Sequence, residues 1–338
     1  MRSFLRPMVG LICLSALVAT GCSPAIGSSS NAASSVPSAK PSATALSTAY
    51  QPYVSATDSS ATDTAGSPSV YNLAFVISDG TSCTPKWYGS EAVDDPAVTA
   101  RIAALTKDGA SVRVSFGGAS GEELASLCGS PSTLAAAYAK ALDTAGSAQA
   151  DFDVEGSQLA DPASVALRSE AIALLQRERA GLEVSFTLPV MPSGLDAHGR
   201  ALLESANDHG VRVSTVNIMT MNYGESYAGD MGDYAITSAE ATHDQLAELF
   251  GLSSQGAWQG MALTSMIGVN DVPGETFTLS DAAQVRSFAE ARGLSWVSMW
   301  STFRDRQCAD DDPSGGDAAT NCSGVQQGPG AFGRALAG

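Results

Sequence analysis

The segment Asp151-Phe152-Asp153-Val154-Glu155 alternates carboxylate and apolar side chains with the two-residue period of a β-strand. The alternation places Asp151, Asp153 and Glu155 on one face of the strand and the apolar side chains on the other. Like charges on one face repel each other, and their burial is costly unless the carboxylates are hydrogen-bonded or protonated. A fold keeps such a strand mainly where the carboxylates carry out acid–base chemistry or bind a cation.

Other side chains that could bind a ligand or take part in catalysis follow the predicted ends of neighbouring strands. We expect them to meet at one mouth, because the C-terminal strand ends line the active site of a barrel. A carboxylate, an amide, a phenol and an indole suit a saccharide, whose hydroxyls bind polar groups and whose ring faces pack on flat apolar side chains. These positions are Ser115 with Gly117-Gly118, Glu155, Met219-Thr220-Met221-Asn222-Tyr223 and Trp300.

Short β-rich runs alternate with alanine-rich helical patterns from about residue 48 onward, and eight such runs over roughly 290 residues predict an α/β fold, the (β/α)8 TIM barrel. A doubly wound open sheet is the alternative, but the glycine-rich residues 117–121 lack the GxGxxG or P-loop spacing. The connection over residues 58–69 is rich in Ser, Thr and Gly, so its helix is expected to be degenerate or replaced by a loop. We predict strands over 53–56, 71–78, 112–116, 150–155, 183–189, 215–221, 261–267 and 294–300, and helices over 97–107, 132–144, 162–179, 197–209, 239–250 and 279–292.

The N-terminal region has the features of an export signal. Arg2 and Arg6 precede an apolar stretch over residues 8–19 that is too short to span a bilayer with ease. Residues 19–22 (Ala-Thr-Gly-Cys) resemble a bacterial lipobox, in which Cys22 is lipidated; ordinary signal-peptidase cleavage is the alternative. We expect a lipoprotein signal peptide over residues 1–21, a flexible Ser/Ala/Pro-rich tether over 22–47 and one barrel domain over 48–338. The domain would be lipid-anchored at the outer face of a bacterial cell membrane, or secreted.

Composition and cysteine count narrow the function further. The 338-residue chain has a net charge of −17, which disfavours binding to nucleic acid or to an anionic membrane surface. Outside the signal and the lipobox, the cysteines are Cys83, Cys128, Cys308 and Cys322, an even number that predicts two disulfides in an exported chain. Three pairings are possible, and closeness in sequence favours Cys83–Cys128 and Cys308–Cys322. No metal site is expected, because no CxxC occurs and the histidines are scattered.

Taken in order, these motifs resemble those of glycoside hydrolase family 18, the chitinase family. Residues 115–118 (SFGG) match its SxGG strand, and residues 151–155 (DFDVE) match the later part of its DxxDxDxE signature. Residues 219–223 (MTMNY) resemble its following Met/Asp/Tyr strand, and Trp300 stands where its barrel-floor tryptophan is expected. Two residues depart from the pattern, since Ala148 replaces the first Asp of the signature and Asn222 replaces the Asp of the later strand.

The resemblance implies retaining hydrolysis that is assisted by the substrate's own acetamido group. Glu155 would protonate the glycosidic oxygen and later act as base toward water, and Asp153 would orient the acetamido group. A neighbouring carboxylate raises the pKa of such an acid, as Glu155 requires. Asp151 lies deeper and would share a proton with Asp153 or serve only the structure. With Ala148 in the signature, this chain of carboxylates is one group shorter.

The same resemblance implies a set of substrate-binding residues, each of which also has a purely structural interpretation. Trp300 would be the floor beneath the sugar or ordinary core, and Asn222 and Tyr223 would bind the acetamido group or only cap the strand. Ser115 and Gly118 would shape the site or only permit tight barrel packing. The full set is Ser115, Gly118, Met219, Met221, Asn222, Tyr223 and Trp300.

We therefore expect a monomeric chitinase-like hydrolase that cleaves β-1,4-linked N-acetylglucosamine polymers and requires no cofactor. Two alternatives stay open: a β-N-acetylglucosaminidase acting on N-glycans or peptidoglycan, and a catalytically weak lectin that binds chitin. No separate carbohydrate-binding module is evident, so exposed aromatic side chains would have to hold an insoluble polymer. Trp87, Trp258 and Tyr227 are candidates for this role.

Overall fold

A computed structural model describes residues 48–309 and 321–338. The predicted signal peptide, the lipidation site Cys22 and the tether all lie outside the described residues. Within the described ranges, no helix combines the length and the hydropathy that a membrane span requires.

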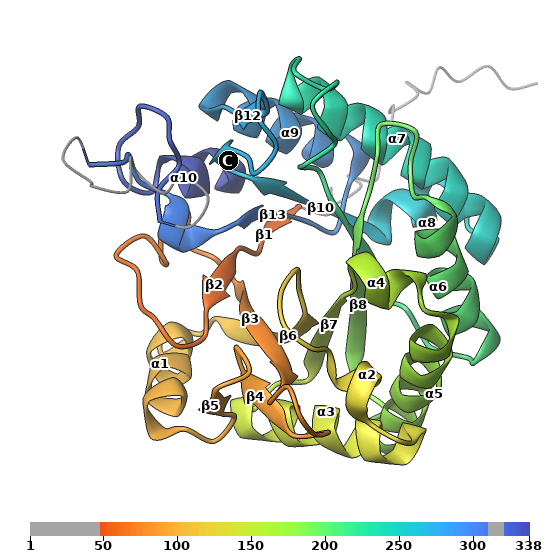
Figure 1. The fold of residues 1–338 in the computed structure, drawn as a ribbon. Helices are drawn as coiled ribbons and strands as arrows, with labels where there is room; N and C mark the ends of the chain where they lie inside the picture. Colours follow the sequence, from red (N-terminus) through yellow and green to blue (C-terminus); the bar gives the residue numbers. More distant parts are fainter. Residues whose placement is uncertain (1–47, 310–320) are drawn as a thin grey trace, which may run out of the picture. The chain divides into compact units, whose positions relative to one another are not determined.

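A ring of parallel strands forms the centre of the fold, and the predicted α/β barrel is confirmed (Figure 1). Each strand pairs in parallel with the next along the chain. The eight predicted strands all occur; the first strand of the barrel is split into β1 and β2, of which only β2 was predicted. The bounds are β1 Ala49–Tyr50, β2 Tyr53–Ser55, β3 Val70–Ser78, β6 Ser111–Gly117, β7 Gln149–Asp153, β8 Glu183–Pro189, β9 Thr215–Met219, β10 Met261–Met266 and β13 Trp296–Trp300.

The split first strand joins the two ends of the parallel series. β1 pairs with β13, the last strand, whereas β2 pairs with β3. Gln51 and Pro52 lie between the two halves, and Pro52 has no N–H to continue a ladder. The Pro52 carbonyl still accepts a hydrogen bond from the Asn72 N–H at 2.9 Å. The ladder is therefore interrupted at this point, while one short segment pairs with both of its neighbours.

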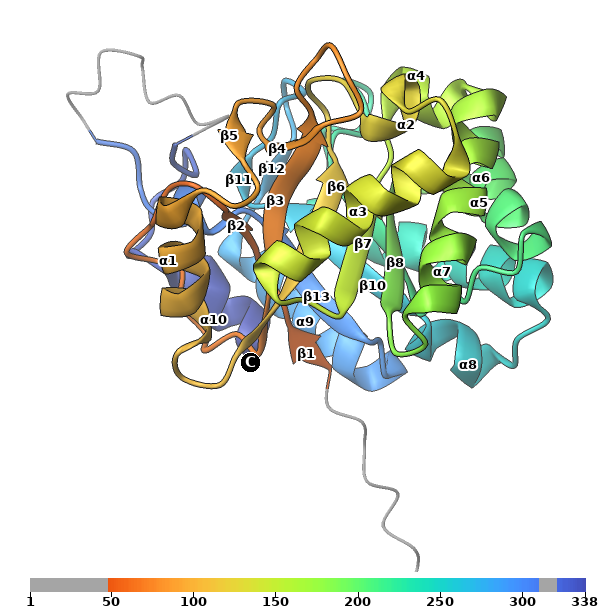
Figure 2. The same ribbon diagram turned by 90° about the horizontal axis from the view of Figure 1, so that it is seen from below.

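Helices surround the barrel, and capping residues explain where most of them begin (Figures 1 and 2). Asp95, Ser130 and Asp161 accept backbone N–H bonds at three helix starts, each followed by proline. One helix begins at Met231 and not at the predicted residue 239, because Asp230 caps it there. The connection over residues 58–69 is a loop without a helix. The bounds are α1 Pro96–Thr106, α3 Pro131–Ala145, α5 Pro162–Glu178, α6 Ala197–Asp208, α7 Met231–Phe250, α8 Ser254–Gln259, α9 Leu279–Arg292 and α10 Ala331–Ala337.

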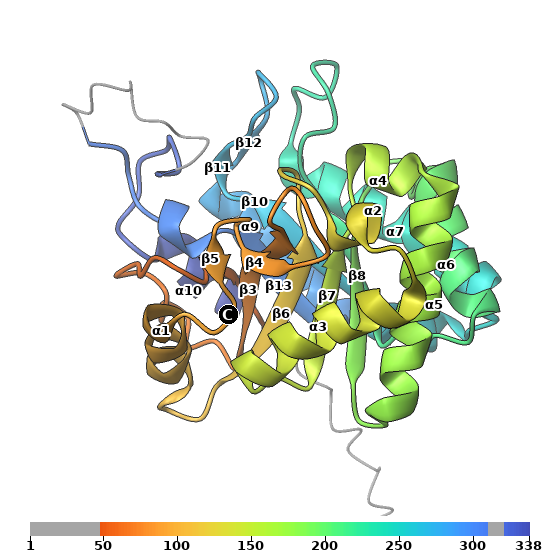
Figure 3. The same cartoon turned by 60° about the horizontal axis from the view of Figure 1, so that its bottom comes forward.

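Short elements follow the C-terminal ends of the strands. In Figure 2, α2 and α4 lie at one end of the barrel, and β1 and the C-terminus lie at the other. Figure 3 shows that the β11–β12 hairpin rises at the same end as α4. These elements form a rim around the mouth to which the strand ends lead. Their bounds are β4 Pro85–Trp87, β5 Glu91–Ala92, α2 Leu124–Leu127, α4 Gly156–Ala160, β11 Gly268–Val269, β12 Thr276–Phe277 and the 3-10 turn η1 Thr302–Arg304.

The two faces of β7 differ, as its sequence alternation predicts. The Phe152 ring packs outside the barrel against the rings of Phe116 and Phe186, with centroids 5.3 and 5.8 Å apart. Asp151 and Asp153 lie on the opposite face, inside the barrel. The strand ends at Asp153 and not at the predicted Glu155, since Glu155 already occupies the residue before α4.

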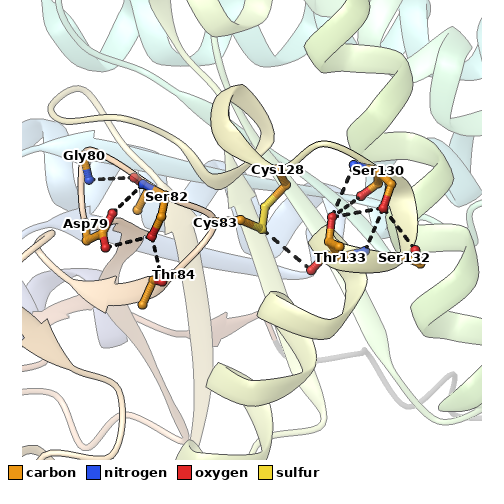
Figure 4. Close-up of a disulfide and its surroundings, with 10 residues drawn as sticks. Asp79, Gly80, Ser82, Cys83, Thr84, Cys128, Ser130, Ser132 and Thr133 are labelled. Carbon is orange, nitrogen blue, oxygen red and sulfur yellow. Dashed lines mark hydrogen bonds between the residues drawn. A yellow bond between two sulfur atoms is a disulfide. The ribbon is translucent and has the colours of Figure 1, made fainter.

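The structure pairs Cys83 with Cys128 and Cys308 with Cys322, the connectivity that closeness in sequence favours. Cys83 lies in the loop between β3 and β4, and Cys128 directly follows α2 (Figure 4). This disulfide therefore ties two rim segments together.

Candidate active site

A pocket opens where the strands end, at the mouth of the barrel. Its cavity volume is about 110 Å³. Of the predicted site residues, Asp153, Glu155, Met219, Met221, Asn222 and Trp300 line it together. The remaining lining residues are Tyr53, Phe75, Ala119, Thr187, Thr264, Met266 and Asp271.

Asp151 lies beneath the pocket and is saturated with hydrogen bonds. Its Oδ2 accepts from the hydroxyls of Tyr53 and Ser115 at 2.8 and 2.6 Å. Its Oδ1 accepts from Ser185 and Thr187 at 2.7 and 2.8 Å. The strand register places Ser115, Asp151 and Ser185 side by side across three strands. Because a carboxylate offers about four acceptor sites, Asp151 has none left for a ligand. Ser115 thus supports Asp151 and does not line the pocket.

Asp153 and Glu155 form a coupled pair of carboxyl groups. Asp153 is only 5% exposed, and its side chain is hydrogen-bonded to that of Glu155. Burial raises the pKa of Asp153 well above its ordinary range, and the charges of Glu155, Asp151 and Glu123 act in the same direction. Burial also raises the pKa of Glu155 to about 7; the hydrogen bond from Asp153 lowers it, and the charges of Glu123 and Asp271 raise it. The pair therefore keeps a proton near neutral pH.

The three carboxylates of this segment form a gradient of exposure. Asp151 is 1% exposed, Asp153 is 5% exposed, and Glu155 is half-buried at the pocket wall. Glu155 is thus the outermost of the three carboxyl groups and the one best placed to reach a ligand in the pocket. Among the described residues, no three His, Cys, Asp or Glu side chains are grouped so that they could hold a metal ion.

An aromatic surface forms one wall of the pocket. The Trp300 ring stacks on Phe75 with centroids 5.4 Å apart, and Tyr53 contacts Trp300 edge-on at 5.9 Å. Gly118 explains how Phe75 fits, because a Cβ at that position would lie 2.9 Å from its ring. Gly118 therefore shapes the wall from behind. The peptide bond between Trp300 and Ser301 is cis.

Asn222 lines the pocket, but its side chain is engaged with the rim. Its Oδ1 accepts from the backbone N–H groups of Asp271 and Val272 at 3.1 and 3.4 Å. Its Nδ2 donates to the Asp271 carboxylate at 3.2 Å. Asn222 also has a φ of 54°, a left-handed conformation that asparagine tolerates better than most residues. Asp271 adds a further carboxylate to the pocket lining, which the sequence analysis does not identify.

Tyr223 lies behind the pocket wall, against α7, and does not line the pocket. It is 4% exposed, and its hydroxyl accepts a hydrogen bond from Ser238 at 3.4 Å. Its ring contacts Tyr227 and Tyr234, with centroids 5.9 and 5.8 Å apart. In this arrangement Tyr223 packs behind the pocket wall, and its contact with an acetamido group stays a prediction.

Ala148 lies far from the carboxylate pair. It is exposed and directly precedes β7, at the opposite end of that strand from the pocket. Its carbonyl accepts from the Glu183 N–H at 3.0 Å. A carboxylate at this position would not lie at the mouth, so the idea that Ala148 shortens a proton chain there is wrong. The additional carboxylate whose charge acts on Asp153 is Glu123, which precedes α2.

The exposed aromatic residue near the pocket is not one of those proposed from sequence. Trp87 is 0% and Trp258 is 7% exposed, so neither can hold a polymer. Tyr227 is partly buried, and its ring packs against Tyr223 and Tyr234. Tyr88 is 41% exposed and lines a second hollow together with Phe303. This hollow and the pocket share Trp300, so the two cavities meet at that side chain.

The known proteins to which this chain is similar include several chitinases. The catalytic domain of a hyperthermophilic chitinase from Pyrococcus furiosus superposes with a TM-score of 0.74 at 30% identity, covering 85% of this chain and 93% of that one. A probable bifunctional chitinase/lysozyme of Escherichia coli (strain K12) and Endochitinase 11 of Metarhizium anisopliae are each 34% identical, over 76% and 71% of this chain. The chain spans 31% and 48% of the length of these curated relatives. A GH18 chitinase from Pseudoalteromonas aurantia, at 15% identity and a TM-score of 0.57, shares the fold. No family model matches the chain.

Proposed function

Because the chain belongs to glycoside hydrolase family 18, the chitinase family, we propose that it hydrolyses β-1,4-linked N-acetylglucosamine polymers such as chitin. The observation that carries this proposal is the hydrogen-bonded pair Asp153–Glu155, which retains a proton beside the aromatic wall of the pocket. A proton donor next to a flat apolar surface suits a glycosidic bond whose sugar ring packs on Trp300.

In the first step, Glu155 donates its proton to the glycosidic oxygen as the bond to the anomeric carbon breaks. The acetamido carbonyl oxygen of the same sugar attacks the anomeric carbon and forms a cyclic oxazolinium ion. Asp153 orients the acetamido group and accepts a hydrogen bond from its N–H. The leaving chain departs with a new hydroxyl group, and Glu155 becomes a carboxylate.

In the second step, the Glu155 carboxylate removes a proton from water, which attacks the anomeric carbon and opens the oxazolinium ring. Two inversions at the same carbon restore the original β configuration. Trp300 supports the sugar from below, while Met219 and Met221 form apolar contacts. Asn222 brings no charge to the oxazolinium ion, and the Asp271 carboxylate beside it supplies one at the same rim.

The hollow beyond Trp300 provides room for more of the polymer. Tyr88 and Phe303 present rings there, and Ser55, Ser59 and Asn321 provide polar groups. This mixture suits further sugar units, whose hydroxyls and faces need both kinds of contact. We therefore place the continuing chain across Trp300 into this hollow.

A second substrate class has one observation in its favour. The E. coli relative is described as a chitinase/lysozyme, which keeps cleavage of peptidoglycan as an alternative, alongside N-glycans. Product analysis on a panel of chitin oligomers, peptidoglycan fragments and N-glycans separates these substrates. A binding-only lectin is disfavoured, since a binder has no need of a protonated Glu155.

We further propose that the domain is exported and anchored by a lipid on Cys22. Two disulfides and the sequence of the N-terminal region support export. Metabolic labelling with a fatty acid should mark the wild-type protein, and Cys22→Ala should abolish the label. A labelled Cys22→Ala protein, or an unlabelled wild type, would exclude the anchor.

The substitution Glu155→Gln tests the proposed activity. It removes the proton donor while it keeps the shape of the side chain, so turnover of chitohexaose should fall by about 10³-fold or more. Glu204→Gln, the same change at an exposed position on α6, should leave turnover unchanged. Circular dichroism checks that both variants are folded. Undiminished hydrolysis by a folded Glu155→Gln variant would refute the proposal.

A further inference from the structure

A third carboxylate, Glu123, lies buried behind the Asp153–Glu155 pair. Glu123 precedes α2, is 7% exposed, and forms an ion pair through Oε2 with the Arg168 guanidinium on α5. Its Oε1 has no hydrogen-bond partner among the residues that the structure describes. A buried carboxylate oxygen without a partner is costly, which prompts the question of what this group does.

The free oxygen of Glu123 faces the end of β7. Gly117 pairs with Asp153 in the register of β6 and β7. A Cβ built on Gly117 would lie 3.4 Å from Glu123 Oε1 and 2.1 Å from the Asp153 carbonyl oxygen. The missing side chain at Gly117 thus lets the Glu123 carboxylate approach the backbone that carries Asp153.

The segment that carries Glu123 is fixed at both sides. The Glu122 carbonyl accepts from the Ser78 N–H at 2.9 Å, and Cys128 is tied to Cys83 by the disulfide. Arg168 is 1% exposed and also donates to Ser164 Oγ at 3.1 Å. The ion pair is therefore a rigid, buried dipole.

The orientation of this dipole follows from the contacts of the two Glu123 oxygens. Oε2 is paired with the Arg168 guanidinium, whereas Oε1 lies against Gly117 at the end of β7. In agreement with this, the charge of Glu123 raises the pKa of both Asp153 and Glu155. The negative end of the dipole thus faces the carboxyl pair, and the positive end lies behind it.

We propose that Glu123, held in place by Arg168, is a positioning residue that keeps one proton on the Asp153–Glu155 pair. An ionised carboxylate behind the pair makes a second negative charge in front of it more costly. The inference rests on the proposed function in that it gives Glu155 the role of the proton donor.

Other titratable groups also face the Asp153–Glu155 pair and affect its protonation. Asp151 lies below it and is saturated by hydroxyl donors, and Asp271 faces Glu155 from the segment after β11. The titratable and charged groups around the pair are Asp151 on β7, Tyr53 on β2, Asp271, and Glu123 with Arg168 on α5 and Tyr138 on α3 behind it.

The test measures protonation directly, without turnover. In protein labelled with ¹³C at the Asp and Glu carboxyl groups, the Glu155 resonance is identified by its loss in Glu155→Gln and followed by NMR against pH. Glu123→Gln removes the negative end of the dipole and leaves the positive one. In this variant, the titration midpoint of Glu155 should therefore fall by roughly one pH unit, the size expected for one buried charge at an effective dielectric constant of about 20.

The double variant Glu123→Gln/Arg168→Met separates charge from packing. It removes both ends of the dipole, so the midpoint should again fall, but by less than in Glu123→Gln. It also leaves no unpaired buried cation and is the variant to use if Glu123→Gln does not fold. If both charges serve only the structure, the midpoint will stay at its wild-type value in a folded variant, and the inference is overturned.

The pH profile of kcat/KM gives a second measurement. In Glu123→Gln, the decline of kcat/KM at high pH should shift to lower pH by the same amount as the NMR midpoint. For a shift of one pH unit, kcat/KM at pH 8 should therefore fall about tenfold. If Glu123→Gln shifts the Glu155 midpoint but the wild-type protein shows no chitinase activity, the proposed function alone is contradicted. Activity with an unmoved midpoint would contradict the role of Glu123 alone.

Discussion

At the scale of single residues, the neighbours of each carboxylate decide what it can do. Asp151 and Asp153 stand on the same face of β7, yet Asp151 receives four hydroxyl hydrogen bonds whereas Asp153 shares one with Glu155. All acceptor sites of Asp151 are occupied, whereas the pair Asp153–Glu155 retains a proton near neutral pH. The alternation of the strand predicts which face they share, but not this division of labour.

The raised pKa of Glu155 predicts a cost in stability. The pKa rises from 4.5 to about 7 on folding, so the folded protein holds a proton that the unfolded chain releases in this window. Wild-type stability should therefore decline as pH rises from about 4.5 to 7, by up to about 3 kcal/mol from this group.

Glu155→Gln cannot ionise, and its melting temperature should exceed that of the wild type more at pH 8 than at pH 4. Thermal melts at the two pH values measure this difference, with Glu204→Gln as the control that removes an exposed charge. A difference that is the same at both pH values would contradict the raised pKa.

Asp271 and Glu123 show where residue-level reasoning from sequence stops. The motif over residues 151–155 is local, so its carboxylates can be recognised from spacing alone. Asp271 and Glu123 belong to rim segments that follow other strands, and no local pattern relates them to Glu155. Only the geometry of the mouth brings them into the same electrostatic environment.

At the scale of elements, the strand ends must fit closely for the carboxyl pair to be held in place. Gly117 has a φ of 101°, and an added Cβ would lie 2.1 Å from the Asp153 carbonyl. Gly109 has a similar φ of 93°, but nothing lies within 4 Å of an added Cβ. The two glycines thus share a backbone conformation and differ in their surroundings.

This contrast predicts different effects of the same substitution. Gly109→Ala should cost about 1 kcal/mol, since only the left-handed conformation is penalised. Gly117→Ala should cost a further 1–3 kcal/mol, roughly, because β7 must shift, and it should lower kcat as Asp153 moves. Urea denaturation and hydrolysis assays measure both effects. Equal costs at the two positions would show that the contact between β6 and β7 is unimportant.

Periodicity predicts the barrel elements well because each strand is a short apolar run and each long helix a repeated amphipathic or alanine-rich pattern. The misplaced start of α7 has a local cause, since its first two turns contain Gly232, Thr237 and Ser238, which favour a helix less than alanine does, while Asp230 caps the helix. The β11–β12 hairpin and the short helices α2 and α4 are not predicted, because a few residues are too short for a recognisable period. These elements build the rim, so the site is harder to predict than the barrel.

At the scale of the whole molecule, two disulfides hold rim and C-terminal segments to the barrel. They close loops with sequence separations of 45 and 14 residues. Chain-entropy estimates give stabilisation of about 4 kcal/mol for Cys83–Cys128 and about 3 kcal/mol for Cys308–Cys322.

The double substitution Cys83→Ser/Cys128→Ser should therefore lower the melting temperature more than Cys308→Ser/Cys322→Ser. The Cys83–Cys128 pair also anchors the segment with Glu123, so its loss should reduce kcat/KM as well. Calorimetry and oligomer hydrolysis measure the two effects. The reverse order of melting temperatures would contradict the loop-closure argument.

The central claim is that Glu155 and the substrate's own acetamido group together cleave the glycosidic bond. The most direct measurement follows the hydrolysis of chitohexaose by ¹H NMR and records the anomer of each new reducing end before mutarotation. Substrate assistance predicts that the first products carry the β anomer, because the anomeric carbon is inverted twice. First products with the α anomer would require direct attack by water and would contradict the account.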